Sequence, residues 1–286
     1  MKTAAIVGIG LIGGSLALAL KRLGLADRVW GVESSEQHAA RALELGLVDE
    51  IVSLDKASTE ARLIAVATPV DTVPTIVTKL LNKASADQVI IDVGSTKQEL
   101  CELVSMHRQR GRFVATHPMW GTEHSGPEAA QKEAFAGRAV VVCERERSDA
   151  DAVELVEEMY RALGMKLIYM GAEEHDLHTA YVSHISHITS FALALTVLEK
   201  EREEEHIFDL AGGGFESTVR LAKSSADTWI PILLENKYNV LDVLREHIHQ
   251  LQILRRMIER DDKQGLRESM NKANTIKRIL KTTSIN

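Results

Sequence analysis

A glycine-rich turn near the start of the chain limits the possible folds more than any other feature. Residues 4–15 read AIVGIGLIGGSL, so Gly8, Gly10 and Gly13 follow an apolar run and precede an apolar helical pattern over 11–23. The first glycine permits a sharp turn off a strand, the second lets the backbone approach a phosphate, and the third lets the helix pack closely. The sequence therefore predicts a strand, a tight turn and a helix N-terminus that faces a pyrophosphate.

The next apolar run indicates which dinucleotide binds there. RVWGV at 28–32 ends at Glu33, twenty residues after Gly13, and no arginine stands at the following Ser34 and Ser35. A carboxylate at this spacing accepts from both hydroxyls of an adenosine ribose and repels a 2′-phosphate. We therefore predict NAD; the alternative for Glu33 is a solvated carboxylate at a strand end. The predicted cofactor-binding residues are Gly8, Gly10, Leu11, Ile12, Gly13, Glu33, Thr68, Pro69 and Ser95.

Composition excludes several classes of partner. The 286 residues are 45% hydrophobic with a net charge of −7 and no basic run, which argues against nucleic acid and anionic membranes. The apolar runs are predicted to fall short of a membrane span, and Met1 leads at once into a strand, so we expect no signal peptide and a cytoplasmic protein. Cys101 and Cys143 form no metal or redox motif and are expected to be reduced core thiols.

Apolar runs alternate with helical segments over the first part of the chain. This alternation predicts an α/β fold with a Rossmann-type, doubly wound, mostly parallel sheet in a domain over 1–171, closed by a helix over 149–163 and a last strand. The strands expected after the first two lie at 51–54, 63–67, 89–93, 113–116, 139–143 and 167–170.

From 172 to 286 the pattern has a helical period throughout. Long apolar stripes predict an all-helical domain for substrate binding and dimerisation. These faces exceed what one small domain can bury, so we expect an intertwined homodimer, with a monomeric bundle as the alternative. The expected helices lie at 176–204, 215–222, 230–260 and 263–282.

Three strand ends carry groups that look reactive: the first is Thr68-Pro69-Val70, and the other two place a serine and a histidine. Ser95 lies in DVGSTK at 92–97, and His117 lies in THPMWGTEHSGP at 116–127. Ligands of open parallel sheets bind at the carboxyl ends of the strands, so both side chains are expected beside the nicotinamide. His117 is a candidate base near neutral pH; the alternative is a structural histidine.

Histidines gather in the first expected helix of the second domain. His175, His178, His184 and His187 fall at helical i,i+3 spacing in two pairs. Zinc pairs on helices more often show i,i+4 spacing with a carboxylate, so we predict no metal and a polar pocket wall of Ser183, His184 and His187. Farther on, Arg220 stands among apolar residues, as a snorkelling surface residue or as an anchor for a substrate carboxylate.

Several motifs together carry a family resemblance over nearly the whole chain. GIGLIGGSLA, DVGSTK, THPMWGTEHSGP, SHISH at 183–187, and GGGFESTVRLAKS at 212–224 occur in this order, followed by Trp229 and LENK at 234–237. With these motifs the chain resembles the prephenate/arogenate dehydrogenase family. The resemblance implies NAD-dependent oxidative decarboxylation in tyrosine biosynthesis. Prephenate would give 4-hydroxyphenylpyruvate, whereas arogenate would give tyrosine directly. The alternative to a prephenate dehydrogenase is therefore an arogenate dehydrogenase, or a cyclohexadienyl dehydrogenase that accepts both substrates.

The resemblance also implies roles for individual residues. His117 would take the proton of the ring hydroxyl, Ser95 would touch that hydroxyl and the cofactor, and Arg220 would bind a carboxylate. The remaining substrate-binding residues would be His187, Ser183, Thr122, His184, Gly213 and Trp229.

The chain departs from the expected family pattern at two positions. Ser217 stands where an acid often precedes the arginine, so the partner of Arg220 is open, with Glu216 as one candidate. Trp120 replaces a smaller residue, which predicts a tighter or more apolar pocket. No appended regulatory domain is recognised, so tyrosine inhibition, if present, is expected at the active site. Glu123 and His124 are candidates for choosing between the two substrates.

Two rival functions remain open. A β-hydroxyacid dehydrogenase or imine reductase shares the two-domain plan but lacks the His-Pro-Met loop and usually carries a lysine where this chain has His184 and His187. A non-catalytic NAD-sensing dimer would bind NAD without turning over a cyclohexadienyl substrate. The presence of Ser95, His117 and Arg220 argues against the sensor.

Overall fold

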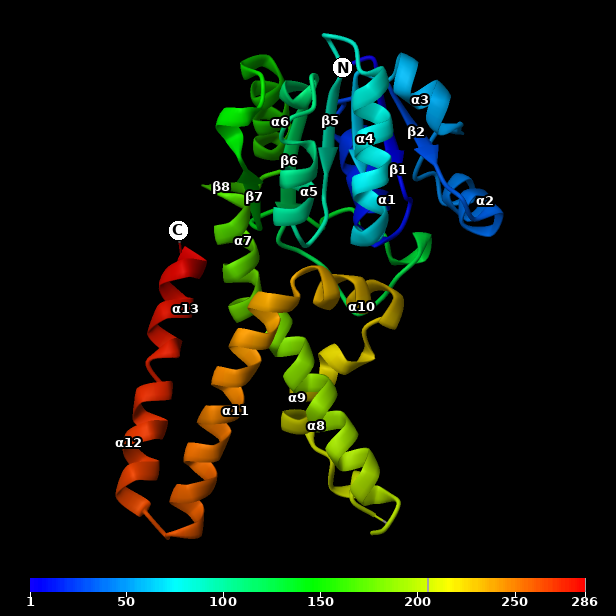
Figure 1. The fold of residues 1–286 in the computed structure, drawn as a ribbon. Helices are drawn as coiled ribbons and strands as arrows, with labels where there is room; N and C mark the ends of the chain where they lie inside the picture. Colours follow the sequence, from blue (N-terminus) through cyan, green and yellow to red (C-terminus); the bar gives the residue numbers. More distant parts are fainter. Residues whose placement is uncertain (205, 286) are drawn as a thin grey trace. The chain divides into compact units, whose positions relative to one another are not determined.

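An eight-stranded sheet organises the first part of the chain in the computed structural model, which describes residues 1–204 and 206–285 (Figure 1). The strand order is β3-β2-β1-β4-β5-β6-β7-β8, and every pair is parallel except β6 with β7. The strands are β1 (Thr3–Val7), β2 (Arg28–Val32), β3 (Glu50–Ile51), β4 (Leu63–Val66), β5 (Val89–Asp92), β6 (Phe113–Pro118), β7 (Ala139–Cys143) and β8 (Lys166–Met170). The predicted α/β, doubly wound, mostly parallel fold is confirmed.

Helices cover both faces of this sheet because each face is apolar. One buried cluster joins the sheet to α1 (Leu11–Arg22), α2 (Glu36–Glu44) and α6 (Ala150–Ala162). A second buried cluster joins the other face to α3 (Leu54–Glu60), α4 (Val73–Lys83) and α5 (Gln98–Val104). The ligand-binding edge of the sheet is therefore rigidly supported from both sides.

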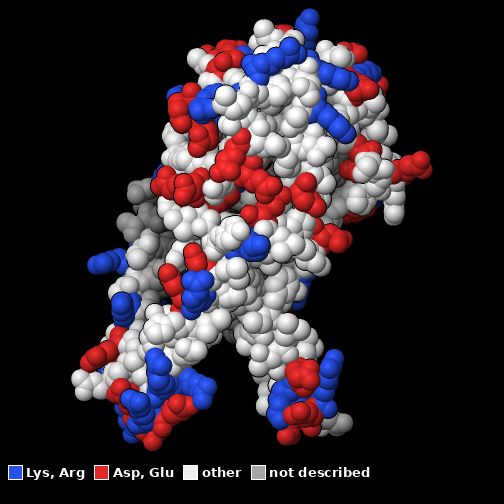
Figure 2. Space-filling model, viewed as in Figure 1, with Lys and Arg blue, Asp and Glu red and all other residues white. Residues whose placement is uncertain are grey.

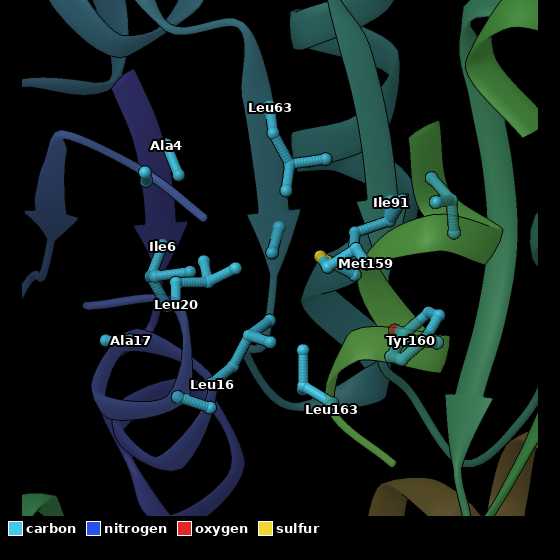
Figure 3. Packing of buried hydrophobic residues seen from close by; sticks show 14 of the residues in the cluster. Ala4, Ile6, Leu16, Ala17, Leu20, Leu63, Ile91, Met159, Tyr160 and Leu163 are labelled. Atoms are coloured by element: carbon cyan, nitrogen blue, oxygen red, sulfur yellow. The ribbon is translucent and has the colours of Figure 1, made fainter. Parts of the chain in front are cut away.

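Side chains from distant parts of the chain interlock in the first cluster (Figure 3). Ile6 of β1 and Leu63 of β4 are fully buried with Leu16 and Leu20 of α1. Tyr160 of α6 is also fully buried, and its hydroxyl lies 2.8 Å from the hydroxyl of Thr116 in β6. This contact satisfies the one polar atom that the aromatic ring brings into the core.

The later part of the chain is helical, as predicted. Its elements are α7 (Ala172–Thr179), a π-helical turn (Ala180–His184), α8 (Ile185–Glu201), α9 (Gly213–Val219), α10 (Ala226–Glu235), α11 (Lys237–Glu259), α12 (Lys263–Ala273) and α13 (Ile276–Ile285). The chain divides into two compact units, Met1–Lys237 and Tyr238–Asn286. The boundary at 171 expected from the sequence stays a prediction.

Four expected elements have different limits in the structure. The strand expected at 51–54 is only Glu50–Ile51, because the Ser53 hydroxyl caps α3 at the N–H of Lys56. The expected helix 176–204 begins earlier and contains the π-helical turn. The expected helices 230–260 and 263–282 are each broken, at Asn236 and at 274–275.

One helical run differs from the expectation about membranes. The continuous helix Ala172–Glu201 is long and apolar enough, by length and composition, to cross a membrane. Its first half carries His175, Asp176 and His184, which are buried and hydrogen-bonded within the first unit. The run therefore belongs to the interior of this fold at its start, with an exposed apolar face farther on.

Both cysteines lie in the apolar interior. Cys101 of α5 and Cys143 of β7 are free and buried. Burial raises the pKa of the Cys101 thiol to about 12, and it raises the pKa of Cys143 as well. Both thiols are therefore protonated and unreactive at neutral pH.

Candidate active site

The glycine turn has the geometry of a phosphate cradle. Gly8 has a φ of +89°, and a Cβ there would lie 2.8 Å from the Ala67 carbonyl oxygen. A Cβ on Gly13 would lie 2.0 Å from the Gly8 carbonyl oxygen, so both positions exclude a side chain. Beyond its own local backbone, no heavy atom of the described residues lies within 4 Å of the place where a Cβ of Gly10 would be. The turn is therefore tight where it meets the sheet and open where the backbone would approach a ligand.

The start of α1 leaves its backbone donors for an anion. Gly10 is the N-cap residue and supplies no side-chain hydrogen bond to the first turn, which begins at Leu11 and Ile12. Free N–H groups and the helix dipole favour negative charge at such an end. The residues present fit the pyrophosphate of a dinucleotide.

Glu33 lies against this turn. Its Oε2 accepts from the backbone N–H of Ile9 at 3.0 Å, and its Oε1 accepts from the N–H groups of Ser34 and Ser35 at 2.9 and 3.0 Å. Each carboxylate oxygen has two acceptor positions, so Oε2 keeps one for a ribose hydroxyl, whereas backbone N–H groups take both positions of Oε1. These hydrogen bonds fix the carboxylate beside the glycine turn.

Thr68 and Pro69 follow β4, the strand beside β1. The Thr68 methyl carbon would lie 2.9 Å from a Cβ of Gly8, so this residue borders the glycine turn. Its hydroxyl oxygen accepts from the Thr72 hydroxyl at 2.7 Å, which fixes the side chain. The structure brings this predicted cofactor contact to the glycine turn.

The end of β5 carries a buried ion pair that sequence reasoning missed. The Lys97 ammonium donates to the Asp92 carboxylate, and both side chains are fully buried. The Gly94 N–H donates to the same carboxylate at 2.9 Å, which bends the chain just before the half-buried Ser95. Ser95 therefore lies on a loop held from beneath by this ion pair.

His117 lies on the next strand, at the same edge of the sheet. β6 pairs with β5 through Ala115 and Asp92, two residues before His117. The imidazole is buried, and burial holds its pKa well below the ordinary value. His117 is therefore neutral at pH 7, which is the form that accepts a proton.

A second histidine and a carboxylate stand behind His117. The Nδ1 of His117 lies 2.8 Å from the Nε2 of His175, and the Nδ1 of His175 lies 2.7 Å from the Oδ1 of Asp176. The sequence analysis grouped His175 with its neighbours by helical spacing and did not connect it to His117. The adjacent His-Asp pair was the available signal, but 58 residues separate the two histidines.

The other two histidines of the cluster face Trp229. The ring of His187 stacks on Trp229 with centroids 3.4 Å apart, whereas the His184 ring meets it edge-on at 5.9 Å. His187 Nδ1 lies 3.0 Å from the carbonyl oxygen of the half-buried Ser183. His184 is buried and accepts from the amide of Asn236 at 3.1 Å. Within residues 1–204 and 206–285, no group of three or more histidine, cysteine or acidic side chains is arranged to hold a metal.

Arg220 pairs with an acid from a distant loop. Its Nη1 donates to the Glu123 carboxylate at 3.0 Å, whereas Glu216 lies 3.9 Å from Lys223 and Ser217 donates to the Gly214 carbonyl. The hydrogen bond from its own backbone N–H, and then the one from Arg220, hold the pKa of Glu123 below its ordinary value. The partner left open by the sequence is therefore Glu123.

The remaining predicted residues lie in the segments that lead to these two side chains or next to the core. Thr122 precedes Glu123 and accepts from the His124 N–H at 3.3 Å, and Gly213 begins α9. Trp120 packs edge-on against Phe135, 5.9 Å between ring centroids, at the border of the first core cluster.

Acidic side chains mark the surface near α5 and α10. Figure 2 shows red side chains gathered across the middle of this face. Glu235 accepts from the Thr96 hydroxyl, and partial burial, with Glu99 and Asp71 nearby, raises its pKa. An anionic ligand that approaches this surface would meet like charge.

Family models match both parts of the chain. The model described as the prephenate dehydrogenase nucleotide-binding domain matches residues 16–169, and the one described as the prephenate dehydrogenase dimerization domain matches 171–272.

Named relatives and solved structures agree with these matches. A prephenate dehydrogenase of Bacillus subtilis is 32% identical over 92% of this chain and 72% of its own length. A cyclohexadienyl dehydrogenase of Zymomonas mobilis is 30% identical over 98% and 97%. The crystal structure of Aquifex aeolicus prephenate dehydrogenase with hydroxyphenyl propionate and NAD+ has a TM-score of 0.89 and 32% identity, with 98% of each chain covered. With both domain models and a near-complete structural match, the chain belongs to the prephenate dehydrogenase family.

Proposed function

We propose that the protein is an NAD-dependent prephenate dehydrogenase, which converts prephenate to 4-hydroxyphenylpyruvate and CO2 on the route to tyrosine. The observation that carries this proposal is the position and state of His117, which is buried and neutral at the ligand-binding edge of the sheet. Its strand, β6, lies in the sheet order β1-β4-β5-β6 that begins with the strand before the glycine turn. The NAD-binding turn and the family membership support the same reaction.

Each residue has a role that follows from its chemistry. NAD, when bound, supplies the hydride acceptor. His117 accepts the proton of the ring hydroxyl as that carbon becomes ketone-like, and Ser95 holds the hydroxyl in place. After CO2 leaves, the ring oxygen is a phenolate, which takes the proton back from His117. No net proton is therefore consumed or released by this residue.

Arg220 is suited to bind a carboxylate of the substrate. Among residues 1–204 and 206–285, only its Nη1 makes a hydrogen bond, to Glu123, so its guanidinium retains donors for a second carboxylate. His187, stacked on Trp229, is a further donor or acceptor for the substrate side chain. Ser183, Thr122, His184 and Gly213 complete the proposed set.

The choice of substrate decides between this function and its alternatives. Purified protein is incubated with prephenate or arogenate, with NAD or NADP, and NADH or NADPH absorbance is followed. We expect turnover of prephenate with NAD. Turnover of arogenate alone would make the protein an arogenate dehydrogenase, and turnover of both a cyclohexadienyl dehydrogenase. NAD binding without turnover of either substrate would favour the NAD-sensing dimer.

We further propose a homodimer. The matched dimerization model supports it, and so does the exposed apolar surface that each of the two units carries. In the first unit Leu195 and Leu198 of α8 are 66% and 51% exposed, and in the second Leu251 and Ile258 of α11 are 52% and 64% exposed. Apolar faces of this kind mark interfaces. Sedimentation equilibrium is expected to give twice the chain mass; a monomer at micromolar concentration would contradict it.

Two further proposals concern regulation and location. Tyrosine has a carboxylate for Arg220 and a phenol for His117, so it is expected to inhibit competitively against prephenate. Inhibition that leaves the KM for prephenate unchanged would place tyrosine elsewhere. We also propose a cytoplasmic location, which cell fractionation tests directly.

A further inference from the structure

Three buried side chains form a continuous hydrogen-bonded line that ends at His117. Asp176 Oδ1 lies 2.7 Å from His175 Nδ1, and His175 Nε2 lies 2.8 Å from His117 Nδ1. All three residues are buried, and the two rings meet edge-on with centroids 5.1 Å apart. The line joins the start of α7 to the end of β6 inside the first unit.

Asp176 is held as an acceptor at its end of the line. Its Oδ1 accepts from the backbone N–H of Lys97 at 2.8 Å, and its Oδ2 accepts from that of Gln98 at 2.9 Å. Both N–H groups are obligatory donors, so both oxygens of Asp176 serve as acceptors. His175 Nδ1 therefore faces an acceptor.

The position of every proton along the line follows from that constraint. His175 must carry its proton on Nδ1 to donate to Asp176, which leaves Nε2 as an acceptor. His117 must then donate from Nδ1 to His175 Nε2, so its own Nε2 is unprotonated. Within residues 1–204 and 206–285, the structure shows no hydrogen bond to that Nε2.

We propose that His175 and Asp176 are positioning residues that fix the proton of His117 on Nδ1 and so present an unprotonated Nε2 to the substrate hydroxyl. The inference rests on the proposed function for its chemical purpose, although the tautomer itself does not. In the reaction the substrate O–H bond breaks and a bond from Nε2 to that proton forms. The Nδ1–H then belongs to an imidazolium, and its hydrogen bond to His175 becomes charge-assisted and stronger.

Lys97 lowers the pKa of both imidazoles, whereas the Asp176 and Asp92 carboxylates raise the pKa of His175. Lys97 and His184 also face His117, and Lys97, Asp176 and Asp92 face His175. The buried Lys97 ammonium disfavours a second positive charge on either imidazole before substrate binds. Burial, more than any single neighbour, holds both histidine pKa values below the ordinary one. Both imidazoles are therefore neutral, with one defined arrangement of protons.

Asn236 holds the far side of this line. Its amide donates to the Asp176 carbonyl at 2.6 Å and to His184 Nδ1 at 3.1 Å. The LENK motif thus supports the segment that carries Asp176.

The tautomer can be read directly without any turnover. Protein labelled with ¹⁵N-histidine is examined by two-bond ¹H–¹⁵N correlation, and the His117 signals are assigned by their loss in His117→Asn. We expect a protonated Nδ1 and an unprotonated Nε2 on His117 at pH 7. A protonated Nε2, or rapid exchange between both tautomers, would overturn the proposal.

Kinetic variants test whether the line matters for the reaction. His175→Phe keeps an aromatic ring but removes the acceptor, and we expect kcat to fall about 100-fold with KM within about threefold. The side-chain carbonyl oxygen of His175→Gln can accept from His117 Nδ1. The kcat of His175→Gln is therefore expected to be about tenfold higher than that of His175→Phe. The matched control is His178→Gln, on an exposed histidine of the same helix, which is expected to behave like the parent protein.

The outcomes separate this inference from the proposed function. A folded His175→Phe that keeps kcat within about threefold of the parent would overturn the inference. If His175→Phe fails to fold, Asp176→Asn takes its place, with the His117 tautomer as the readout and Glu174→Gln as its exposed control. If the parent protein turns over neither substrate but shows the expected tautomer, the proposed function fails and the assignment of the line stands.

Discussion

Arg220 and Glu123 form an ion pair with a distance of 3.0 Å from Nη1 to Oε2, although 97 residues separate them. Glu123 comes from the loop after β6, the strand that carries His117, and Arg220 follows α9. Ser190 of α8 fixes the turn around Arg220, because its hydroxyl donates to the Thr218 carbonyl and accepts from the Ala222 N–H, both at 3.0 Å. The proposed anchor for a substrate carboxylate is thus tied to the loop that follows the candidate base.

Replacing Arg220 tests this anchor. Arg220→Gln is expected to raise the KM for prephenate about 30-fold, since a charge-assisted pair with a carboxylate contributes about 2 kcal/mol. Because the reacting carbon is not touched, kcat should change much less. Lys223→Gln removes a cation from the same turn and serves as the control. Steady-state kinetics measure both; an unchanged KM in Arg220→Gln would remove the anchor from the mechanism.

His117→Asn tests the base. Asparagine has a similar size but cannot accept a proton near neutral pH, so kcat is expected to fall about 100-fold or more. The KM should stay close to that of the parent protein, which isothermal titration with the substrate checks independently. Near-normal turnover in this variant would show that another group takes the proton.

Glu33→Gln tests cofactor choice. Loss of the carboxylate removes the repulsion of a 2′-phosphate and weakens the ribose contact, so the ratio of kcat/KM for NAD over NADP is expected to fall about tenfold or more. Glu36→Gln, at the exposed start of α2, is the matched control. An unchanged ratio would mean that Glu33 does not contact the cofactor and only accepts hydrogen bonds from the neighbouring backbone N–H groups.

Stability is expected to fall as the pH drops below the ordinary histidine pKa. Burial lowers the pKa of His184 to about 4, from an ordinary value of 6.5. Above 6.5 the residue is neutral in both folded and unfolded chains, so it contributes no pH dependence. Between 6.5 and about 4 the unfolded chain binds the proton and the folded chain does not, so unfolding becomes easier as pH falls.

Urea denaturation across this pH range measures the effect. The slope from one such histidine approaches about 1.4 kcal/mol per pH unit. His184→Gln is expected to reduce the slope whatever it does to the overall stability, whereas the exposed control His38→Gln should not. An unchanged slope in His184→Gln would mean that His184 does not bear the lowered pKa.

Local patterns in the sequence were sufficient for the architecture and the nucleotide turn. Glycine spacing, apolar periods and the acid after the second strand act over short distances, so they predicted the α/β sheet, the helical part and the turn around Gly8. The limits of some helices and strands differ from those expected where two local signals compete. The Ser53 cap begins helix α3 inside an expected strand, and Asn236 separates two helices that the apolar period had predicted to be one.

Only the tertiary structure decided which residues meet. His117 and His175, Arg220 and Glu123, and Asp176 and Lys97 are brought together across 58, 97 and 79 residues. No periodicity encodes such pairs, because each depends on the order of strands in the sheet and on the packing of α7 and α9 within the first unit. The sequence by itself determined the elements and the candidate base; the fold determined the partners that set the proton and charge of that base, since hydrogen bonds and desolvation depend on distances in space.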